Sequence, residues 1–141
     1  MTAHAYKVSL YIIGIVIAFT SCSGYQKLLK NGDPEVKYQT AVNYFNKKDF
    51  MRAATLFNDV SGYYKGTEQS QDVLHYICES YEGMKDYATA IEYYKNYTRS
   101  FPRGKYIQQA KFKIGYCYYL DSPDARLDQT QTREAVSALQ E

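Results

Sequence analysis

The pattern of apolar and polar residues divides the chain into a short apolar opening and a longer body with a regular repeat. Residues 8–19 are apolar except for Ser9 and Gly14. In the body, tyrosines and small residues each return at intervals of 37 positions. The members of these two series are Tyr44, Tyr81 and Tyr118, and Ala41, Cys78 and Gly115. An internal repeat of this kind indicates an array of similar structural units.

Each unit has the pattern of two antiparallel helices. A small residue stands three positions before the repeated tyrosine, and in the next segment an alanine precedes an aromatic residue by four positions, as in Ala53 and Phe57. The tetratricopeptide repeat has such a pattern, because small residues allow two helices to approach and aromatic rings fill the space beside them. The sequence therefore predicts an all-α fold, a solenoid of tetratricopeptide-repeat helical hairpins. A generic helical bundle is the alternative.

Residues that favour helix starts mark out three units. Asp33, Asp49 and Asp86 are placed to cap helix N-termini, with Pro34 at a first helical position. Helices are expected near residues 34–46, 50–65, 68–83, 87–100 and 105–120. They form a first repeat at 34–70, a second at 71–107 and a third at 108–141.

The third unit departs from the pattern. An insertion at about residues 120–132 separates its two helices, and the alanine–apolar pair appears only at Ala135 and Leu139. Asp128 or Thr130 is expected to cap this last helix. The chain stops inside the helix, whereas a repeat array normally ends with a polar capping helix. We therefore expect an N-terminal fragment of a longer, truncated array.

The apolar opening predicts export. A helix needs about 20 residues to cross a bilayer, so the run at 8–19 is too short. Lys7 precedes it, and the small residues Thr20 and Ser21 follow it. This order of charge, short apolar core and small residues is typical of a secretory signal peptide.

Cys22 follows the small residues directly, and the segment 19–22 resembles the lipobox of bacterial lipoproteins. In that class the cysteine sulfur receives lipid and the preceding peptide is removed. The prediction is a lipoprotein signal peptide at 1–21, a covalent lipid on Cys22 and a lipidated linker at 22–33. An uncleaved signal anchor or a plain secretory signal are the alternatives.

The amino-acid composition limits the classes of binding partner that the chain can have. The formal net charge is only +2, from 17 Lys and Arg against 15 Asp and Glu, so a clustered basic surface for nucleic acid is not expected. The chain has 17 tyrosines, which suit half-buried helix faces and binding grooves. The cysteines that remain beside Cys22 are Cys78 and Cys117, and a disulfide between them is left open.

The first helix of each unit is expected to line a groove that binds peptides or partner proteins. The residues predicted to face it are Tyr38, Val42, Phe45 and Asn46 in the first unit, His75, Glu79 and Glu82 in the second, and Phe112, Tyr116 and Tyr119 in the third. Lys105, Lys111 and Lys113 are candidates to pair with a client carboxylate. The alternative is that the tyrosines pack between helices and the lysines are solvated.

Catalytic chemistry is not expected. His75, Cys78 and Glu79 lie within one turn, but Cys78 occupies the small buried position of the repeat, where packing already explains it. His75, Glu79 and Glu82 would hold a divalent ion only weakly, and no further ligands are visible. We therefore predict no enzyme, no metal and no cofactor other than the lipid on Cys22.

A longer set of features resembles one family. It comprises the lipobox cysteine, "YQKLLKNGDPEVKYQTAVNYFNKKDFMRAATLFNDV" (25–60), "FPRGKYIQQAKFKIGYCYY" (101–119) and the insertion "SPDARLDQTQTREAVSALQE" (122–141). Together they resemble the BamD family of outer-membrane protein assembly lipoproteins. The resemblance runs from Cys22 to Glu141 and covers about half of the family's five repeats.

The resemblance implies a non-enzymatic role. Members of the BamD family are lipid-anchored on the periplasmic face of the cell outer membrane, in a complex that inserts β-barrel proteins. Early repeats are proposed to bind unfolded β-barrel proteins, and later repeats dock other subunits, so docking by this chain is uncertain. A different periplasmic repeat lipoprotein, such as a scaffold for cell-envelope enzymes, is the runner-up.

Overall fold

Helices make up most of the structure, a computed structural model that describes residues 24–123 and 127–140. The helices are α2 (Pro34–Asn46), α3 (Phe50–Ser61), α4 (Ser70–Gly83), α5 (Tyr87–Ser100), α6 (Ile107–Leu120) and α7 (Thr130–Gln140). A helical stretch at 24–31 precedes α2, and the described residues contain no strand. The signal peptide predicted at 1–21 and the lipid site Cys22 lie outside the described residues.

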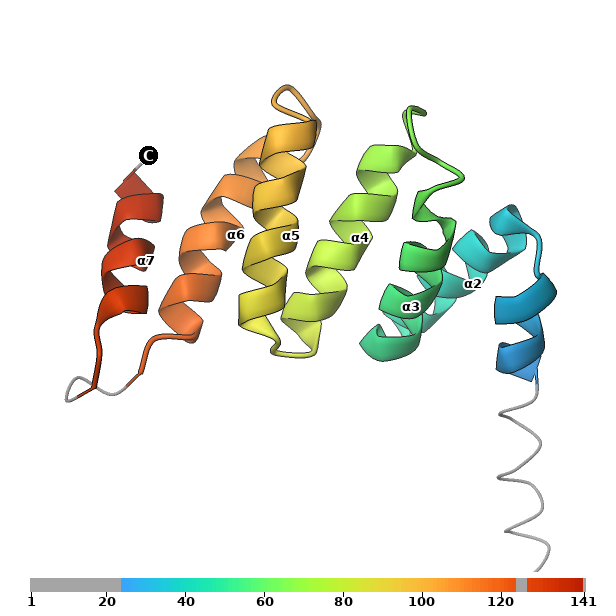
Figure 1. Ribbon diagram of the computed structural model, residues 1–141, viewed down its shortest axis with the longest axis horizontal. Coiled ribbons are helices and arrows are strands. Elements are labelled where there is room, and N and C mark those ends of the chain that lie inside the picture. The colour runs from blue at the N-terminus through green and yellow to red at the C-terminus, as the bar shows by residue number, and fades with distance from the viewer. Residues whose placement is uncertain (1–23, 124–126, 141) are drawn as a thin grey trace, which may run out of the picture.

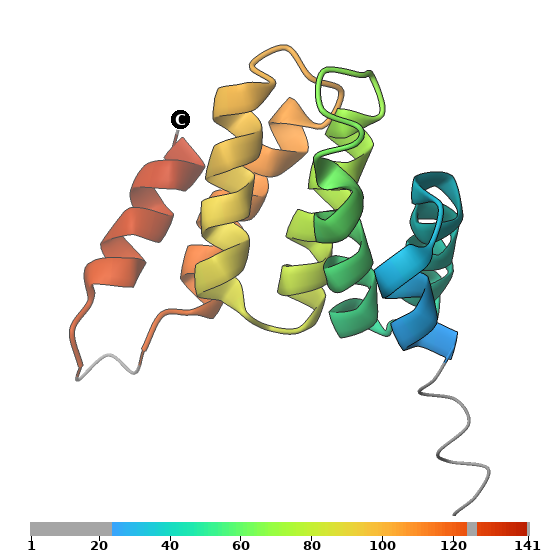
Figure 2. The ribbon, with the colours of Figure 1, turned by 45° about the vertical axis from the view of Figure 1, so that its right-hand side comes forward.

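Consecutive helices pack against each other along the whole series, from α2 on α3 to α6 on α7. Figure 1 shows them side by side with alternating directions. The first helices of the three units are α2, α4 and α6, and the second helices are α3, α5 and α7. In Figure 2, α3 and α5 lie in front of α4 and α6. The predicted all-α, tetratricopeptide-like solenoid is confirmed.

Aspartate caps begin the helices where the sequence predicted them. Asp33 accepts backbone N–H bonds from Glu35 and Val36 at 2.9 and 3.4 Å. Asp49 and Asp86 accept equivalent bonds at the starts of α3 and α5. These bonds satisfy amides that have no partner within the helix.

Two connections are longer than predicted. α3 ends at Ser61 instead of residue 65, and α4 begins at Ser70 instead of 68. The chain between them turns through residues 62–69, where Gly66 has a left-handed φ of 82° that glycine adopts at little cost. α6 begins at Ile107, two residues later than predicted, after the turn at Gly104.

The core follows the repeat. Ala41 and Cys78 are fully buried, and Gly115 is buried at the equivalent position of α6. Phe57 is also fully buried and stacks on Tyr76 of α4, with ring centroids 4.9 Å apart. The small residues therefore bring the helices close, and aromatic rings fill the space between neighbouring hairpins.

The helical stretch at 24–31 is fastened to the first unit. The ring of Tyr25 meets Tyr44 edge-on at 5.8 Å, and the Arg52 guanidinium lies 5.7 Å from Tyr25 and 5.5 Å from Tyr44. At the other end, the buried Lys37 ammonium donates to the Leu29 carbonyl at 2.8 Å and to Asp59 at 2.6 Å. This structural role of Lys37 was not predicted from the repeat pattern.

The link between α6 and α7 occupies residues 121–129, slightly less than the predicted insertion. Asp128, two residues before the start of α7, accepts the backbone N–H of Thr130 at 3.1 Å and so satisfies one amide at the N-terminus of this helix. Ala135 is buried, and Leu139 lies against Gly115. The alanine–apolar pair therefore packs α7 onto α6 as the repeat pattern requires.

Gly115→Ala tests this contact. An added Cβ would lie 2.6 Å from Leu139 Cγ and 3.3 Å from the Leu139 backbone nitrogen, so α7 must move away. We expect the free energy of unfolding to fall by about 1–2 kcal/mol and amide hydrogen exchange in α7 to accelerate. Gly62→Ala is the control, because nothing lies within 4 Å of its Cβ position. Equal stability of the two variants would contradict the packing described.

Candidate peptide-binding surface

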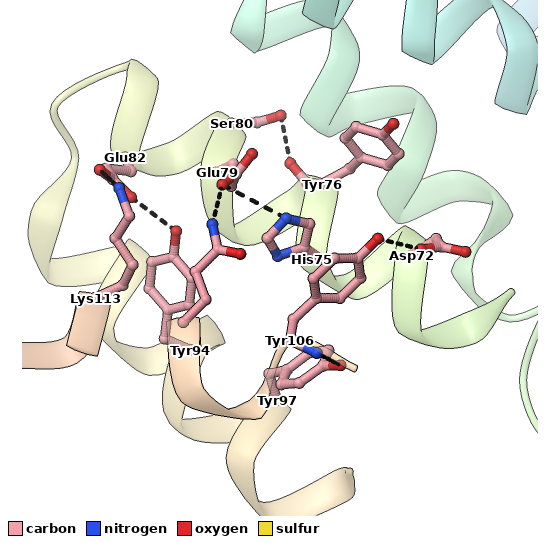
Figure 3. Close-up of polar contacts among 11 residues, drawn as sticks. Asp72, His75, Tyr76, Glu79, Ser80, Glu82, Tyr94, Tyr97, Tyr106 and Lys113 are labelled. Atoms are coloured by element: carbon pink, nitrogen blue, oxygen red, sulfur yellow. Dashed lines mark hydrogen bonds and ion pairs between the residues drawn. The ribbon is translucent and has the colours of Figure 1, made fainter. Parts of the chain in front are cut away.

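A series of polar contacts joins the first helices of the second and third units (Figure 3). Gln109 donates to Glu79 at 2.8 Å, and Lys113 donates to Glu82 at 2.5 Å. At the other end of α4, the hydroxyl of Tyr106 donates to Asp72 at 2.7 Å. Two of the three α4 residues predicted for the groove, Glu79 and Glu82, therefore bond to α6.

His75 belongs to the same contact. Its ring stacks on Tyr106 with centroids 3.8 Å apart and an interplanar angle of 9°, and the residue is only 8% exposed. Its Nε2 lies 3.5 Å from Glu79. Burial lowers the pKa of His75 to about 4 and raises the pKa of Glu79. His75 is therefore neutral at physiological pH and serves as a flat ring between two helices.

Glu82 has both carboxylate oxygens engaged. Oε1 pairs with Lys113, and Oε2 accepts the hydroxyl of the buried Tyr94 at 2.7 Å. Burial and this bond raise the pKa of Tyr94 far above its ordinary value, so the phenol stays a donor. Among the described residues, no group of three or more His, Cys, Asp or Glu is arranged to hold a metal ion.

The groove residues predicted on α2 mostly pack inside the first unit. Tyr38 meets Phe57 and Tyr64 edge-on at 5.7 and 5.5 Å. Phe45 lies between aromatic rings of α3 and α4, at 5.5 Å from one and 5.0 Å from the other. Asn46, the last residue of α2, is exposed. The two aromatic side chains therefore contribute to the core, as the alternative reading held.

The third unit differs, because its predicted aromatic residues are exposed. Phe112, Tyr116 and Tyr119 are 55%, 36% and 64% exposed, and we call them the α6 aromatic stripe. The rings of Phe112 and Tyr116 stack with centroids 5.9 Å apart. The Lys113 ammonium lies 5.5 Å from the Tyr116 ring centroid. The stripe thus combines stacked aromatic faces with an adjacent ion pair.

Two of the three lysines proposed to bind a carboxylate already pair with side chains of α4. Lys105 lies 2.6 Å from Asp72, and Lys113 pairs with Glu82. Lys111 is exposed and directly precedes Phe112 in α6. A client carboxylate at Lys105 or Lys113 would have to compete with these carboxylates.

The two described cysteines are buried thiols. Cys78 and Cys117 are free and fully buried. Burial raises the pKa of Cys117 to about 12 and raises that of Cys78 further above its ordinary value. Since the thiolate is the nucleophile, neither sulfur is prepared for nucleophilic chemistry.

The structure also contains a cavity that the sequence pattern did not predict. It has a volume of about 540 Å³ and lies between α3, α4 and α5, beside the turn at 62–69. Val73 and Ile77 of α4 line it together with Tyr93 and Phe101. The only sequence signal was the glycine-containing segment between α3 and α4, which was predicted to be shorter than it is.

The lowered pKa of His75 predicts how the free energy of unfolding depends on pH. The ordinary pKa of 6.5 applies to the unfolded chain, whereas the folded value is about 4. Between these values the unfolded chain takes up the proton first, so stability falls as pH drops from about 6.5 to about 4, by roughly 2–3 kcal/mol in total. His75→Phe keeps an aromatic ring on Tyr106 and should remove this component.

Chemical denaturation of wild type and His75→Phe at pH 7 and pH 4.5 measures the effect. Glu79 changes stability in the opposite direction, because its pKa is raised, but it is present in both proteins and largely cancels in the difference. A wild-type stability that falls no more steeply than that of the variant would refute the assignment of His75 as neutral and buried.

Comparison with known proteins identifies the family of this helical array. A profile of the family YfiO, described as outer membrane lipoprotein, matches residues 30–141. No curated protein matches the chain. None of the helices in the described part is both long and apolar enough to cross a membrane. The matched segment includes every helix from α2 to α7, and the chain therefore belongs to the YfiO family of outer membrane lipoproteins.

Proposed function

We propose that the protein is a non-enzymatic, lipid-anchored component of the machinery that assembles β-barrel proteins in the outer membrane. Its family is one of outer membrane lipoproteins, which supports its association with that membrane. The opening of the sequence, with Cys22 after a short apolar run, supports export and lipid attachment. The helical body would then lie on the periplasmic face.

The α6 aromatic stripe is the observation that supports binding. Most aromatic side chains of the repeats are buried or partly buried, but Phe112 and Tyr119 are more than half exposed on the helix that also carries Tyr116. Aromatic side chains offer large contact areas at low entropic cost, and aromatic pairs each contribute about 0.5–1.5 kcal/mol beyond area burial. Segments of unfolded β-barrel proteins are rich in exposed aromatic and β-branched residues, which such a surface suits.

The other predicted groove residues have supporting roles in this proposal. Glu79 and Glu82 bond to α6, and so fix the helix that carries the stripe. His75 does the same through its stack on Tyr106. Tyr38 and Phe45 support the first unit from inside, while Asn46 is exposed.

Peptide binding tests the proposal. Carboxy-terminal peptides of β-barrel proteins should bind the chain, and Phe112→Ala with Tyr119→Ala should weaken binding by roughly tenfold, because two aromatic contacts are lost. Fluorescence anisotropy of labelled peptides measures this. Tyr63→Ala is the control, because Tyr63 is 68% exposed on the turn after α3. Absence of binding at high micromolar peptide would favour the runner-up, a scaffold for cell-envelope enzymes.

Metabolic labelling tests the anchor. A palmitate analogue should label the wild-type protein and leave Cys22→Ser unlabelled, since the sulfur is the predicted attachment point. The variant should also leave the membrane fraction. Equal labelling of both proteins would place the lipid elsewhere or show that Cys22 carries none. Co-purification measures whether this chain docks other subunits of the assembly machinery.

A further inference from the structure

We propose that one corner of the solenoid rests on anionic phospholipid headgroups of the bilayer that holds the anchor. This anchor corner consists of Lys47, Lys48, Met51 and Arg52, at the turn between α2 and α3. The inference rests on the proposed lipid at Cys22 and adds an orientation to it. It assigns a surface of the folded body to the membrane itself.

Distance along the chain supports this placement. The Arg52 guanidinium lies 5.7 Å from the centre of the Tyr25 ring. Cys22 is three residues before Tyr25, and consecutive Cα atoms are about 3.8 Å apart, so their Cα atoms are at most about 11 Å apart. A lipid on Cys22 therefore brings the bilayer surface close to the anchor corner, whatever path the intervening residues take.

The stretch that leads to the anchor is attached to the body. Tyr25 packs against Tyr44, and Lys37 holds the Leu29 carbonyl at 2.8 Å. The helical stretch at 24–31 is thus fixed to the first unit at both ends, so the anchor corner stays within reach of a bilayer that holds a lipid on Cys22. A tethered contact acts at high effective concentration, so modest attraction is sufficient to fix an orientation.

The chemistry of the corner matches an anionic interface. Lys47 and Lys48 are exposed, Arg52 is partly exposed, and Asp49 is the single carboxylate among them. Asp49 is occupied by Arg52 at 2.9 Å and by the start of α3. Met51 is 71% exposed beside these cations. Cations next to an exposed apolar side chain suit the boundary between headgroups and acyl chains.

The backbone of the α2–α3 turn favours glycine at position 48, yet the residue there is lysine. Lys48 has a φ of 61°, and Lys85 has a φ of 62° at the equivalent position one unit later. Glycine adopts this conformation without the steric cost that a Cβ brings. Figure 1 places the α2–α3 and α4–α5 turns on the same edge as the start of the 24–31 stretch. Lys48 and Lys85 belong to these two turns.

A site-specific fluorophore tests the orientation in the full lipidated protein. Met51→Cys and Tyr63→Cys are labelled with a polarity-sensitive dye and reconstituted into vesicles of phosphatidylcholine, with or without phosphatidylglycerol. Tyr63 is a matched control, because it is 68% exposed and belongs to the turn between α3 and α4. Figure 1 shows this turn on the edge of the solenoid opposite the α2–α3 turn. Cys78 and Cys117 are fully buried and stay unlabelled in the folded protein.

We expect a blue shift and quenching by brominated lipid at position 51 in vesicles with phosphatidylglycerol, and neither at position 63. Lys47→Gln with Lys48→Gly should weaken this contact by roughly fivefold for each lysine removed. Glycine suits the φ of 61° at position 48, so the variant is expected to keep the folded turn. Lys65→Gln, on the opposite edge, should have no effect.

The outcomes separate the two proposals. Equal signals at positions 51 and 63, or a signal at 51 that ignores phosphatidylglycerol and the lysine substitutions, would overturn the orientation while leaving the lipid anchor intact. A chain that does not enter vesicles and carries no lipid by mass spectrometry would overturn the anchor and this inference together.

Discussion

The structure depends on the small residue that stands three positions before each repeated tyrosine. Ala41 and Cys78 are fully buried there, and at Gly115 even one added carbon would collide with Leu139. Close approach of helix backbones is what lets each hairpin bury its aromatic ring against the next. A large side chain at any of these positions would separate the two helices of a unit and expose the ring that the next unit needs.

The close packing of the helices also determines where the polar residues of the first helices point. Once α4 and α6 are close, the side chains that a sequence pattern directs to an open groove meet the neighbouring helix instead. Glu79 and Glu82 each find a partner on α6, and His75 stacks on Tyr106 directly before it. Such satisfied contacts fix the relative rotation of two units, and so determine which face of α6 remains available to a partner. Exposure of the stripe and stability of the interface are therefore linked.

The sequence predicted the fold well because the repeat is local. The 37-residue spacing, the aspartate caps and Pro34 each act within one helix or one hairpin, and the helices begin or end within a few residues of the predictions. The site was less predictable, because exposure depends on contacts between units. Phe45 and Phe112 look alike as aromatic residues on first helices, yet one lies between two rings and the other faces solvent. The role of Lys37 depends on Asp59 and Leu29, which only the packed hairpin brings together.

Each helix packs against the one before it and the one after it, which has a consequence for biogenesis. Contacts between residues near in sequence close quickly, because little chain entropy is lost in forming them. A chain that emerges N-terminus first can therefore complete its first hairpin before the rest of it has emerged. Each later hairpin then adds to a surface already built, so only a short unfolded length is exposed to proteases at any moment.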